Sequence, residues 1–444
     1  MKVFDEAPED IFRSEESLGV WEHRGKVAAV GIGHAPTMRR WDNDPETCVG
    51  AISICALRQA MADAGVDPGQ VDGLIIDPVT ATGAGWPKDK PIPQDMLARW
   101  QATDDPLDGL TKNSIAWLLK NMPELTGIQF AMNASGCMSK ALVAAVQAVG
   151  DGETHTCLVL KAWHNFEGRY YQGGDNENDS LPGTAALTAL TNLWGAPACS
   201  ATAIQFNEYC HKYGKSHAMM APFMENSRRN GLLFPEGYWA QHRPEELTVQ
   251  DYLAARWIAE PANLFDNDLP IMCSGAYLLT TAERAIHLAQ TPVYILNHAS
   301  SRAVPRSIMP TLEEVEVETA RTGRKIYEGA GIIVEDLSFE NMYDGFSLFH
   351  QFHLEGLGFR GVGQGEALDF YQTDISIHGP NPVSPSGGNI GSGRSRFWMH
   401  TDSIQQIQKR AGARQITGVP SEIGVSGGPM PMGGNFTVWG VAPD

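Results

Sequence analysis

Residues 130–149 read FAMNASGCMSKALVAAVQAV, a strand pattern that passes through a turn of small residues into an Ala-rich helix. A reactive group at such a turn gains from the positive end of the helix dipole, so the segment predicts an active-site turn. Asn133 stands at the end of the strand, where an asparagine also predicts a cap for the following helix. The nearest thiol, Cys137, comes one helical turn later.

The composition limits the class of protein. A chain of 444 residues is too long for one simple core, so we expect two or more packed domains. The net charge of −19 argues against binding to nucleic acid or to an anionic membrane surface. No stretch approaches the ~20 apolar residues of a membrane span, and the acidic N-terminus lacks the apolar region of a secretory signal.

The cysteines indicate a reducing compartment. The 7 cysteines are scattered, without the C-x-x-C pairs of a zinc site. An odd, dispersed set in a long chain is typical of reduced thiols. We therefore expect a cytoplasmic protein without a metal site.

Strand and helix patterns alternate along the chain, which predicts α/β layering. One frame occurs twice, as AGVDPGQVDGLIID at 64–77 and AGIIVEDLSFENMY at 330–343. Each copy reads as a helix end at Ala-Gly, an acidic spacer and a strand. The echo suggests a duplication, although short helix–strand units recur in many α/β folds.

Several stretches in order resemble the thiolase superfamily, specifically its sterol-carrier-protein thiolase and lipid-transfer-protein branch. They are YCHKYGKSHAMMAPFMENSRRNGLL (209–233), LTVQDYLAARWIAEPANLFDNDLPIMCSGAYLLTTAERA (247–285), ENMYDGFS (340–347), HLEGLGFRGVGQGEA (353–367), NPVSPSGGNIGSGRS (381–395) and ARQITGVPSEIGVSGGPMPMGG (413–434). The resemblance covers nearly everything from Lys26 onward.

This resemblance implies the thiolase fold, with duplicated α/β halves in five-layer α/β/α/β/α packing and an inserted loop domain. We expect an N-terminal arm at 1–24, a first half at 25–165 with 250–288, a loop domain at 166–249 and a second half at 290–444.

The chain departs from the family at its covalent machinery. Thiolases use a cysteine nucleophile, a histidine that activates it and a second cysteine as acid and base. By position these become Asn133, Arg394 and Val425. An amide forms no thioester, and an arginine stays protonated near neutral pH, so the covalent relay is absent.

The family's oxyanion hole survives such changes, because backbone N–H groups do not depend on the side chain. Here the two donors fall at Asn133 and Gly427. Such a hole stabilises the enolate of an acyl-CoA thioester by several kcal/mol. Without an acyl acceptor, this chemistry suits retro-aldol cleavage of a β-hydroxyacyl-CoA, as in the steroid side-chain aldolases that the chain resembles.

The resemblance gives the proton-carrying role to Tyr343, in the loop where related thiolases carry Asn or His. A free tyrosine has a pKa of ~10, and we expect the Arg394 guanidinium to lower that value. His350 and His400 are candidates for the second proton carrier. Asp344 is a further site candidate, although such residues more often orient a loop backbone.

Other readings stay open. Cys137 is either a buried small residue of the helix or the nucleophile of a thiolase-like acyltransferase whose nucleophile position is shifted along the sequence. The whole chain is either an enzyme or a non-catalytic subunit that supports an active partner. Arg394 binds a phosphate or a partner in an alternative reading. Arg228 and Arg229 are candidates for CoA phosphates or a solvated pair.

A final pair of residues and the partners complete these expectations. His350 and His353 lie three apart without a third metal ligand, which favours packing.

We expect no bound cofactor, with CoA entering as part of the substrate. We also expect a homodimer formed through the edge of the N-terminal sheet. The resemblance adds a small OB-fold partner with a zinc ribbon, giving a heterotetramer. The 86–125 insertion and the N-terminal arm are candidate contact regions.

Overall fold

The computed structural model describes residues 1–77, 90–135, 139–165, 199–302, 310–431 and 433–444. Within these ranges no helix combines the length and the apolarity that crossing a bilayer requires.

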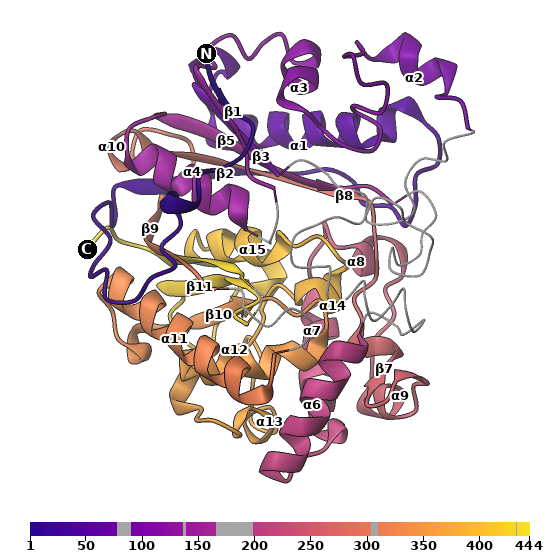
Figure 1. Ribbon diagram of the computed structural model, residues 1–444, viewed down its shortest axis with the longest axis vertical. Helices are drawn as coiled ribbons and strands as arrows, with labels where there is room; N and C mark the ends of the chain where they lie inside the picture. The colour runs from indigo at the N-terminus through magenta and orange to yellow at the C-terminus, as the bar shows by residue number, and fades with distance from the viewer. Residues whose placement is uncertain (78–89, 136–138, 166–198, 303–309, 432) are drawn as a thin grey trace.

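The main sheet contains two blocks of strands, one from each half of the chain (Figure 1). The first block has the order β1-β4-β3-β5-β8-β2 and the second has the order β9-β12-β11-β10. The first block comprises β1 (Lys2–Phe4), β2 (Val27–His34), β3 (Gly73–Asp77), β4 (Phe130–Asn133), β5 (Thr156–Trp163) and β8 (Cys273–Thr281). The second comprises β9 (Val293–Ser300), β10 (Phe339–Met342), β11 (Ile423–Gly428) and β12 (Asn435–Gly440). The blocks meet only where Ala28 and Ala29 of β2 pair with Tyr294 and Val293 of β9.

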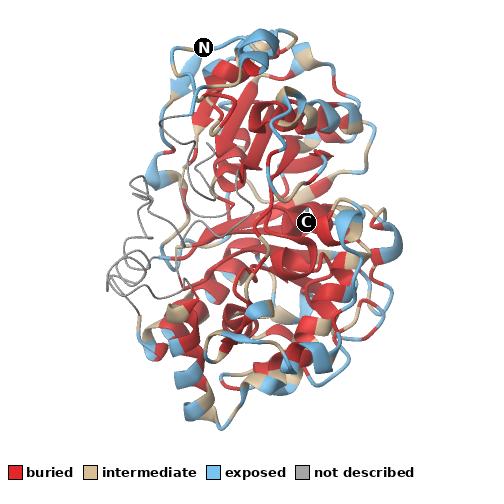
Figure 2. Cartoon of the chain, turned by 90° about the vertical axis from the view of Figure 1, so that its right-hand side faces the viewer, coloured by how far each residue is buried: buried red, intermediate tan, exposed pale blue. Residues whose placement is uncertain are grey.

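Helices cover both faces of each block, giving the five layers expected from the resemblance. The outer layers are α1 (Val49–Ala64) on the first block and α11 (Leu312–Ala330) with α12 (His350–Leu357) on the second. The middle layer contains α4 (Lys140–Gly150) and α15 (Trp398–Ile407). Ile75 of β3 packs in the core of this middle layer, whereas its neighbours Leu74 and Ile76 pack under α1. The strands are buried on both faces for this reason, as Figure 2 shows.

The duplication suggested by the sequence is present. Gly65 ends α1 at φ 67° and ψ 33°, and Gly331 ends α11 at φ 64° and ψ 35°. Each glycine is followed by a short 3₁₀ helix, Pro68–Gln70 or Val334–Asp336, and then by β3 or β10. Only glycine adopts this left-handed conformation without a steric cost, which explains the repeated Ala-Gly.

Strand order shows the same duplication and identifies equivalent loops. The order β3-β5-β8-β2 of the first half corresponds to β10-β11-β12-β9 in the second, where β10 matches β3. Val383 forms an isolated parallel bridge to Glu340 of β10, in the place that β4 occupies beside β3. The Gly-rich loop after Val383 is therefore the counterpart of the turn after β4.

The inserted segment packs against this Gly-rich loop. It contains α6 (Ser200–Tyr213), α7 (Ala221–Leu232), α8 (Tyr238–His242) and α9 (Val249–Leu253), with the small β6 (Trp257–Ala259) and β7 (Ala262–Asn263) following. A Cβ atom on Gly231 of α7 would lie 2.0 Å from the carbonyl oxygen of Gly391. Gly391 belongs to the short α14 (Gly388–Ser392), so α7 and the loop meet backbone to backbone. The domain limits drawn from the sequence stay a prediction.

The N-terminal arm joins elements of both halves of its own chain. Trp21 is 1% exposed, and its indole N–H donates to Gln147 Oε1 of α4 at 3.1 Å. Its ring meets that of His298 in β9 edge-on at 5.2 Å, and its backbone N–H donates to Gly329 of α11 at 2.8 Å. The arm that the sequence left unexplained thus contacts three elements of the core.

The arm also covers the sheet edge that we expected to form a homodimer. β1 pairs in parallel with β4 from Lys2↔Phe130 to Phe4↔Met132. A second copy cannot hydrogen-bond to this stretch of β4 while β1 stays in place, because each edge strand offers its backbone groups once. In this structure β1 forms this edge of the sheet, and the homodimer stays a prediction.

The described part of the 86–125 insertion packs beside α1. It contains α2 (Gln94–Arg99) and α3 (Ile115–Asn121). Trp117 of α3 is 1% exposed, and Gly50 of α1 makes room for its ring, since a Cβ atom there would lie 2.2 Å from it. The described C-terminal region also contains α13 (Ala367–Phe370) and three short 3₁₀ helices, Ser347–Phe349, Phe359–Gly361 and Gly412–Arg414.

Trp21→Ala tests the role of the arm. We expect a loss of ~3–5 kcal/mol in the free energy of unfolding, because the change leaves a cavity between the halves. Urea titration measures this loss. Leu18→Ala is the control on the same arm, because Leu18 is 48% exposed, and we expect a change within ~0.5 kcal/mol. Equal effects of the two substitutions would contradict a bracing role for Trp21.

Candidate active site

Tyr343 follows β10 directly and lies against the final Gly-rich strand. Its backbone N–H donates to the carbonyl oxygen of Gly427 at 2.9 Å, its side chain packs with Met399, and it is 4% exposed. A Cβ atom on Gly345 would lie 2.0 Å from the Tyr343 hydroxyl oxygen. Because Gly345 has no side chain, the Tyr343 ring can pack against the backbone of its own loop, next to the strand that carries Gly427.

Asp344 holds the Gly-rich loop. Its carboxyl group is fully buried and accepts the backbone N–H of Asn389 at 2.7 Å and that of Ile390 at 3.4 Å. Gly388 has φ +61°, and a Cβ atom there would lie 2.0 Å from Asp344 Oδ2. Burial raises the pKa of Asp344 to about 7. These contacts favour the reading in which Asp344 orients a loop.

Arg394 lies beside this loop with a carboxylate as its partner. Its Nε is 3.3 Å from Asp268 Oδ2, and both residues are 2% exposed. The backbone N–H of Asp268 donates to the carbonyl of Gly345 at 3.0 Å, so the pair adjoins the Tyr343 loop. Because Asp268 offsets the guanidinium charge, Arg394 stabilises a phenolate less than the sequence suggested. Sequence reasoning missed Asp268, although it is an acidic residue within a quoted family stretch.

Gly427 occupies a position that only glycine fits. Its φ is +133°, and a Cβ atom would lie 2.1 Å from the carbonyl oxygen of Asn435. The neighbouring Val425 is fully buried in the second half's core. Tyr343 and Gly427 are thus brought together, and no proton-carrying group stands at Val425.

Asn133 does not stand at the start of the helix, contrary to our expectation. It is the last residue of β4, whereas α4 begins at Lys140 with Ser139 at the N-cap position. Asn133 therefore does not cap the helix, and its Oδ1 is buried without a hydrogen-bond partner among the described residues. The small-residue pattern of the sequence did not reveal this separation between the strand end and the helix start. Cys137 lies outside the described residues.

Ser139 begins a hydrogen-bonded chain across the middle layer. Its Oγ contacts His400 Nε2, and His400 Nδ1 lies 2.7 Å from Ser426 Oγ. Burial lowers the pKa of His400 to about 3, so its imidazole is neutral at ordinary pH. A neutral, buried histidine is a poor second proton carrier. The sequence offered no local signal for this chain, since its members lie far apart in the sequence.

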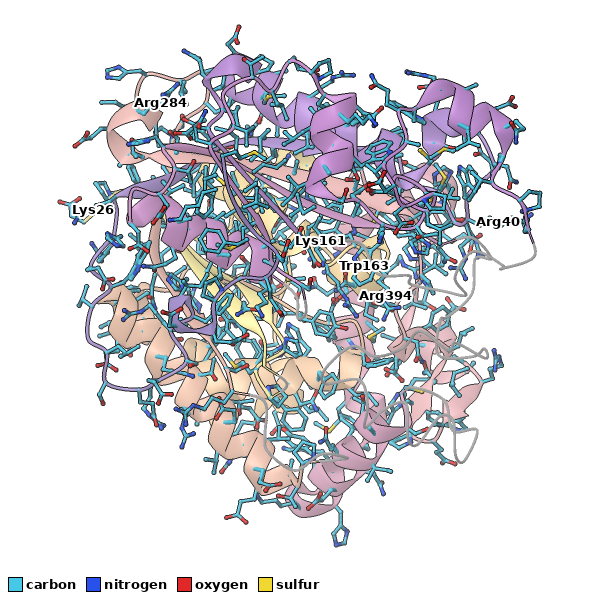
Figure 3. All side chains as sticks on the ribbon, turned by 45° about the horizontal axis from the view of Figure 1, so that its top comes forward. Lys26, Arg40, Lys161, Trp163, Arg284 and Arg394 are labelled. Atoms are coloured by element: carbon cyan, nitrogen blue, oxygen red, sulfur yellow. The ribbon has the colours of Figure 1, made fainter. Side chains whose placement is uncertain are left out.

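A second polar group lies at the carboxyl ends of β3 and β5. Lys161 forms an ion pair with Asp77 and lies 4.8 Å from the centre of the Trp163 ring. The Trp163 indole N–H donates to the carbonyl of Ser395 at 2.8 Å. Figure 3 shows Lys161, Trp163 and Arg394 together in the interior. This group joins the first half to the Gly-rich loop, and sequence reasoning missed it.

The residues suggested for CoA phosphates differ in exposure. Arg228 is 4% exposed, its guanidinium stacks on Trp239 at 3.6 Å, and it donates to the Glu245 carbonyl at 3.1 Å. These contacts bury the guanidinium of Arg228 and favour a packing role over contact with a CoA phosphate. Arg229 is exposed and donates to Asn226 Oδ1 at 2.6 Å.

His350 and His353 use their rings in separate contacts. His350 lies 2.8 Å from the Tyr371 hydroxyl and 3.2 Å from Ser384 Oγ. His353 Nε2 accepts the backbone N–H of Met430 at 3.2 Å, and burial holds its pKa well below the usual value. These contacts support the packing interpretation over a metal pair.

Comparisons with known proteins agree with this architecture. Residues 304–435 match the family described as thiolase C-terminal domain-like. The chain is 25% identical over 375 residues to the 17-hydroxy-3-oxo-4-pregnene-20-carboxyl-CoA lyase of Mycobacterium tuberculosis, covering 83% of this chain and 87% of that protein. It is 24% identical over 375 residues to a steroid side-chain-cleaving aldolase of Thermomonospora curvata, covering 83% and 86%.

A solved structure shows the same fold. The Ltp2–ChsH2(DUF35) aldolase superposes with a TM-score of 0.73 at 20% identity, over 94% of this chain and 98% of that chain. Together with the five layers and the duplicated strand order, this likeness confirms the expected thiolase fold.

The raised pKa of Asp344 predicts a pH-dependent stability. The unfolded carboxyl ionises near its ordinary pKa of 3.8, whereas the folded one stays protonated up to about 7. Between these values the unfolded state binds fewer protons, so rising pH destabilises the fold. The free energy of unfolding of the wild type, measured relative to that of Asp344→Asn, should fall by on the order of a few kcal/mol between pH ~4 and ~7. Urea titrations of both proteins across this range measure it, and a constant difference would contradict the assignment.

Proposed function

We propose that this chain, which has the thiolase fold and resembles steroid side-chain-cleaving aldolases, catalyses retro-aldol cleavage of a β-hydroxyacyl-CoA. The products are a ketone or aldehyde and a shorter acyl-CoA. The observation that carries the proposal is the buried Tyr343 bonded to Gly427, at a site whose cysteine and histidine positions hold Val425 and Arg394.

The reaction needs no covalent intermediate. The hydroxyl proton of the substrate passes to a base as the carbon–carbon bond breaks, and the hydroxyl carbon becomes a carbonyl. The bonding electrons move onto the α-carbon and the thioester oxygen as an enolate, which then takes a proton at carbon. Tyr343 serves as the proton carrier, and backbone donors that include Gly427 stabilise the enolate.

The remaining site residues position these groups. Asp344 holds the Gly-rich loop through Asn389, and the Arg394–Asp268 pair holds the far side of the Tyr343 loop. A neutral pair beside the phenol leaves the local charge balanced, so its main contribution is geometric.

The substrate we propose is the CoA ester of a steroid or bile-acid side chain. Support comes from the name of the mycobacterial relative, which acts on a 17-hydroxy steroid carrying a 20-carboxyl-CoA. In that name the hydroxyl group is β to the thioester carbonyl, which is the relation a retro-aldol step requires. Arg229 remains the candidate for a CoA phosphate on this chain.

We also propose a protein partner. The similar solved structure, the Ltp2–ChsH2(DUF35) aldolase, joins two proteins in one aldolase. A small OB-fold protein with a zinc ribbon fits this role, and two copies of each chain would form a heterotetramer. Zinc would then belong to the partner.

Tyr343→Phe tests the chemistry. The change keeps the ring's packing on Met399 and removes only the ionisable hydroxyl. We expect kcat to fall ~10²–10⁴-fold, the usual cost of losing general acid–base catalysis. The assay follows release of the shorter acyl-CoA from a β-hydroxyacyl-CoA.

Cys137→Ala is the matched variant for this test. It should keep most of the activity, because the proposed path forms no thioester on the enzyme. Activity that survives Tyr343→Phe but is lost in Cys137→Ala would favour a thiolase-type acyltransferase. Wild-type protein that cleaves nothing, with or without a partner, would indicate a non-catalytic subunit.

The partner proposal predicts that the chain purified alone is weakly active. Co-expression with an OB-fold protein encoded nearby should raise both yield and kcat, because the partner would cover surface that the isolated chain exposes. Size-exclusion chromatography with light scattering measures the assembly. Full activity from the chain alone would remove this proposal.

A further inference from the structure

The hydrogen-bonded chain from Ser139 to Trp439 has a direction that the chemistry of its members fixes. The Trp439 indole N–H can only donate, and it donates to Ser426 Oγ at 2.6 Å. Ser426 Oγ also lies 2.7 Å from His400 Nδ1. Since His400 is neutral, one of its nitrogens donates and the other accepts.

Two arrangements are possible for this histidine. If Nδ1 donated to Ser426, that hydroxyl would accept twice and its own proton would need a third partner. If Ser426 instead donates to Nδ1, every group from Trp439 to His400 is satisfied by the contacts already present. Each arrangement thus leaves one hydroxyl proton unused by the chain, that of Ser426 in the first and that of Ser139 in the second. The second arrangement is favoured because Ser426 is fully buried, whereas Ser139 is 5% exposed and its proton can meet a bound molecule. His400 Nε2 then carries the proton and donates to Ser139 Oγ.

This direction leaves the hydroxyl proton of Ser139 unused by the chain. Ser139 is 5% exposed and stands at the N-terminus of the 11-residue α4, where the helix dipole favours nearby negative charge. Its φ of +67° is a left-handed conformation that costs a serine energy. A strained backbone that points a donor out of a satisfied chain indicates a functional position.

Two members of the chain are next in sequence to residues of the candidate active site. Met399, against which Tyr343 packs, is the residue before His400. Ser426 is the residue before Gly427, whose carbonyl oxygen accepts the Tyr343 backbone N–H. The Ser139 hydroxyl is thus joined through one histidine to the strand that carries the Gly427 donor.

We propose that Ser139 donates a hydrogen bond to the thioester oxygen of a bound acyl-CoA as it becomes an enolate oxygen. It adds a side-chain donor to the backbone donors that the resemblance implies at Asn133 and Gly427. His400 and Ser426 are positioning residues that hold the hydroxyl in the donating direction. The inference rests on the proposed lyase function and adds a further catalytic residue to it.

Ser139→Gly tests this role without the usual risk of misfolding. Glycine adopts a positive φ freely, so the melting temperature should not fall by more than the loss of one hydrogen bond implies. We expect kcat to fall ~10²–10³-fold, the usual cost of removing one oxyanion donor, with little change in KM. Ser17→Gly is the matched control, because Ser17 also has a positive φ of 61° and lies exposed on the arm.

Ser426→Ala tests the direction of the chain. Without the Ser426 hydroxyl, His400 can carry its proton on Nδ1 and accept the Ser139 hydroxyl proton at Nε2. The Ser139 hydroxyl then no longer donates to the substrate, so kcat should fall. The double variant Ser139→Gly with Ser426→Ala should be no slower than Ser139→Gly alone. Additive losses, or losses that follow the melting temperature, would mean that the chain is only structural and would overturn the inference.

A second assay separates this inference from the lyase proposal. The exchange of α-hydrogens of propanoyl-CoA in D₂O, followed by NMR, reports enolate stabilisation without carbon–carbon cleavage. Wild-type exchange that falls in Ser139→Gly supports the inference even if the chosen β-hydroxyacyl-CoA is not cleaved. If Ser139→Gly cleaves and exchanges as fast as the wild type, the role of Ser139 is overturned while the lyase function stands. Wild-type protein that neither cleaves nor exchanges overturns both.

Discussion

The buried carboxyl group of Asp344 is the contact on which the site depends. It accepts backbone N–H groups of Asn389 and Ile390, and so fixes the Gly-rich loop against the loop that carries Tyr343. The same Gly-rich loop approaches α7 backbone to backbone at Gly231 and Gly391. One carboxyl group thereby sets the relative positions of β10, the loop and the inserted segment. Burial of the carboxyl group explains why its pKa rises to about 7.

The chain has the thiolase fold, while the resemblance matches Asn133, Arg394 and Val425 to the positions of the family's covalent relay. Arg394 is neutralised by Asp268, and Val425 is part of the hydrophobic core. Backbone donors and small residues at tight contacts remain, because the packing of the two halves requires them. Chemistry that needs only charge stabilisation and one proton carrier is compatible with such a site, and acyl transfer through a second cysteine at Val425 is not.

The arm and the middle layer hold the two halves together. The strand blocks share only a short contact between β2 and β9, so the packing of α4, α15 and Trp21 supplies most of the junction. The Ser139–His400–Ser426 chain crosses the same layer. The candidate donors therefore come from opposite halves, and their alignment depends on how these halves are braced.

The sequence by itself determined the alternation of strands and helices, the repeated glycine caps at Gly65 and Gly331, and the residue types that stand at the positions matched to the cysteine relay. These features follow from local periodicity, from φ angles that only glycine tolerates and from residue chemistry. Only the tertiary structure decided that α4 begins at Ser139 and not near Asn133, that Arg394 meets Asp268, and that Arg228 is buried. These outcomes depend on contacts between residues far apart in the chain, which no local pattern encodes.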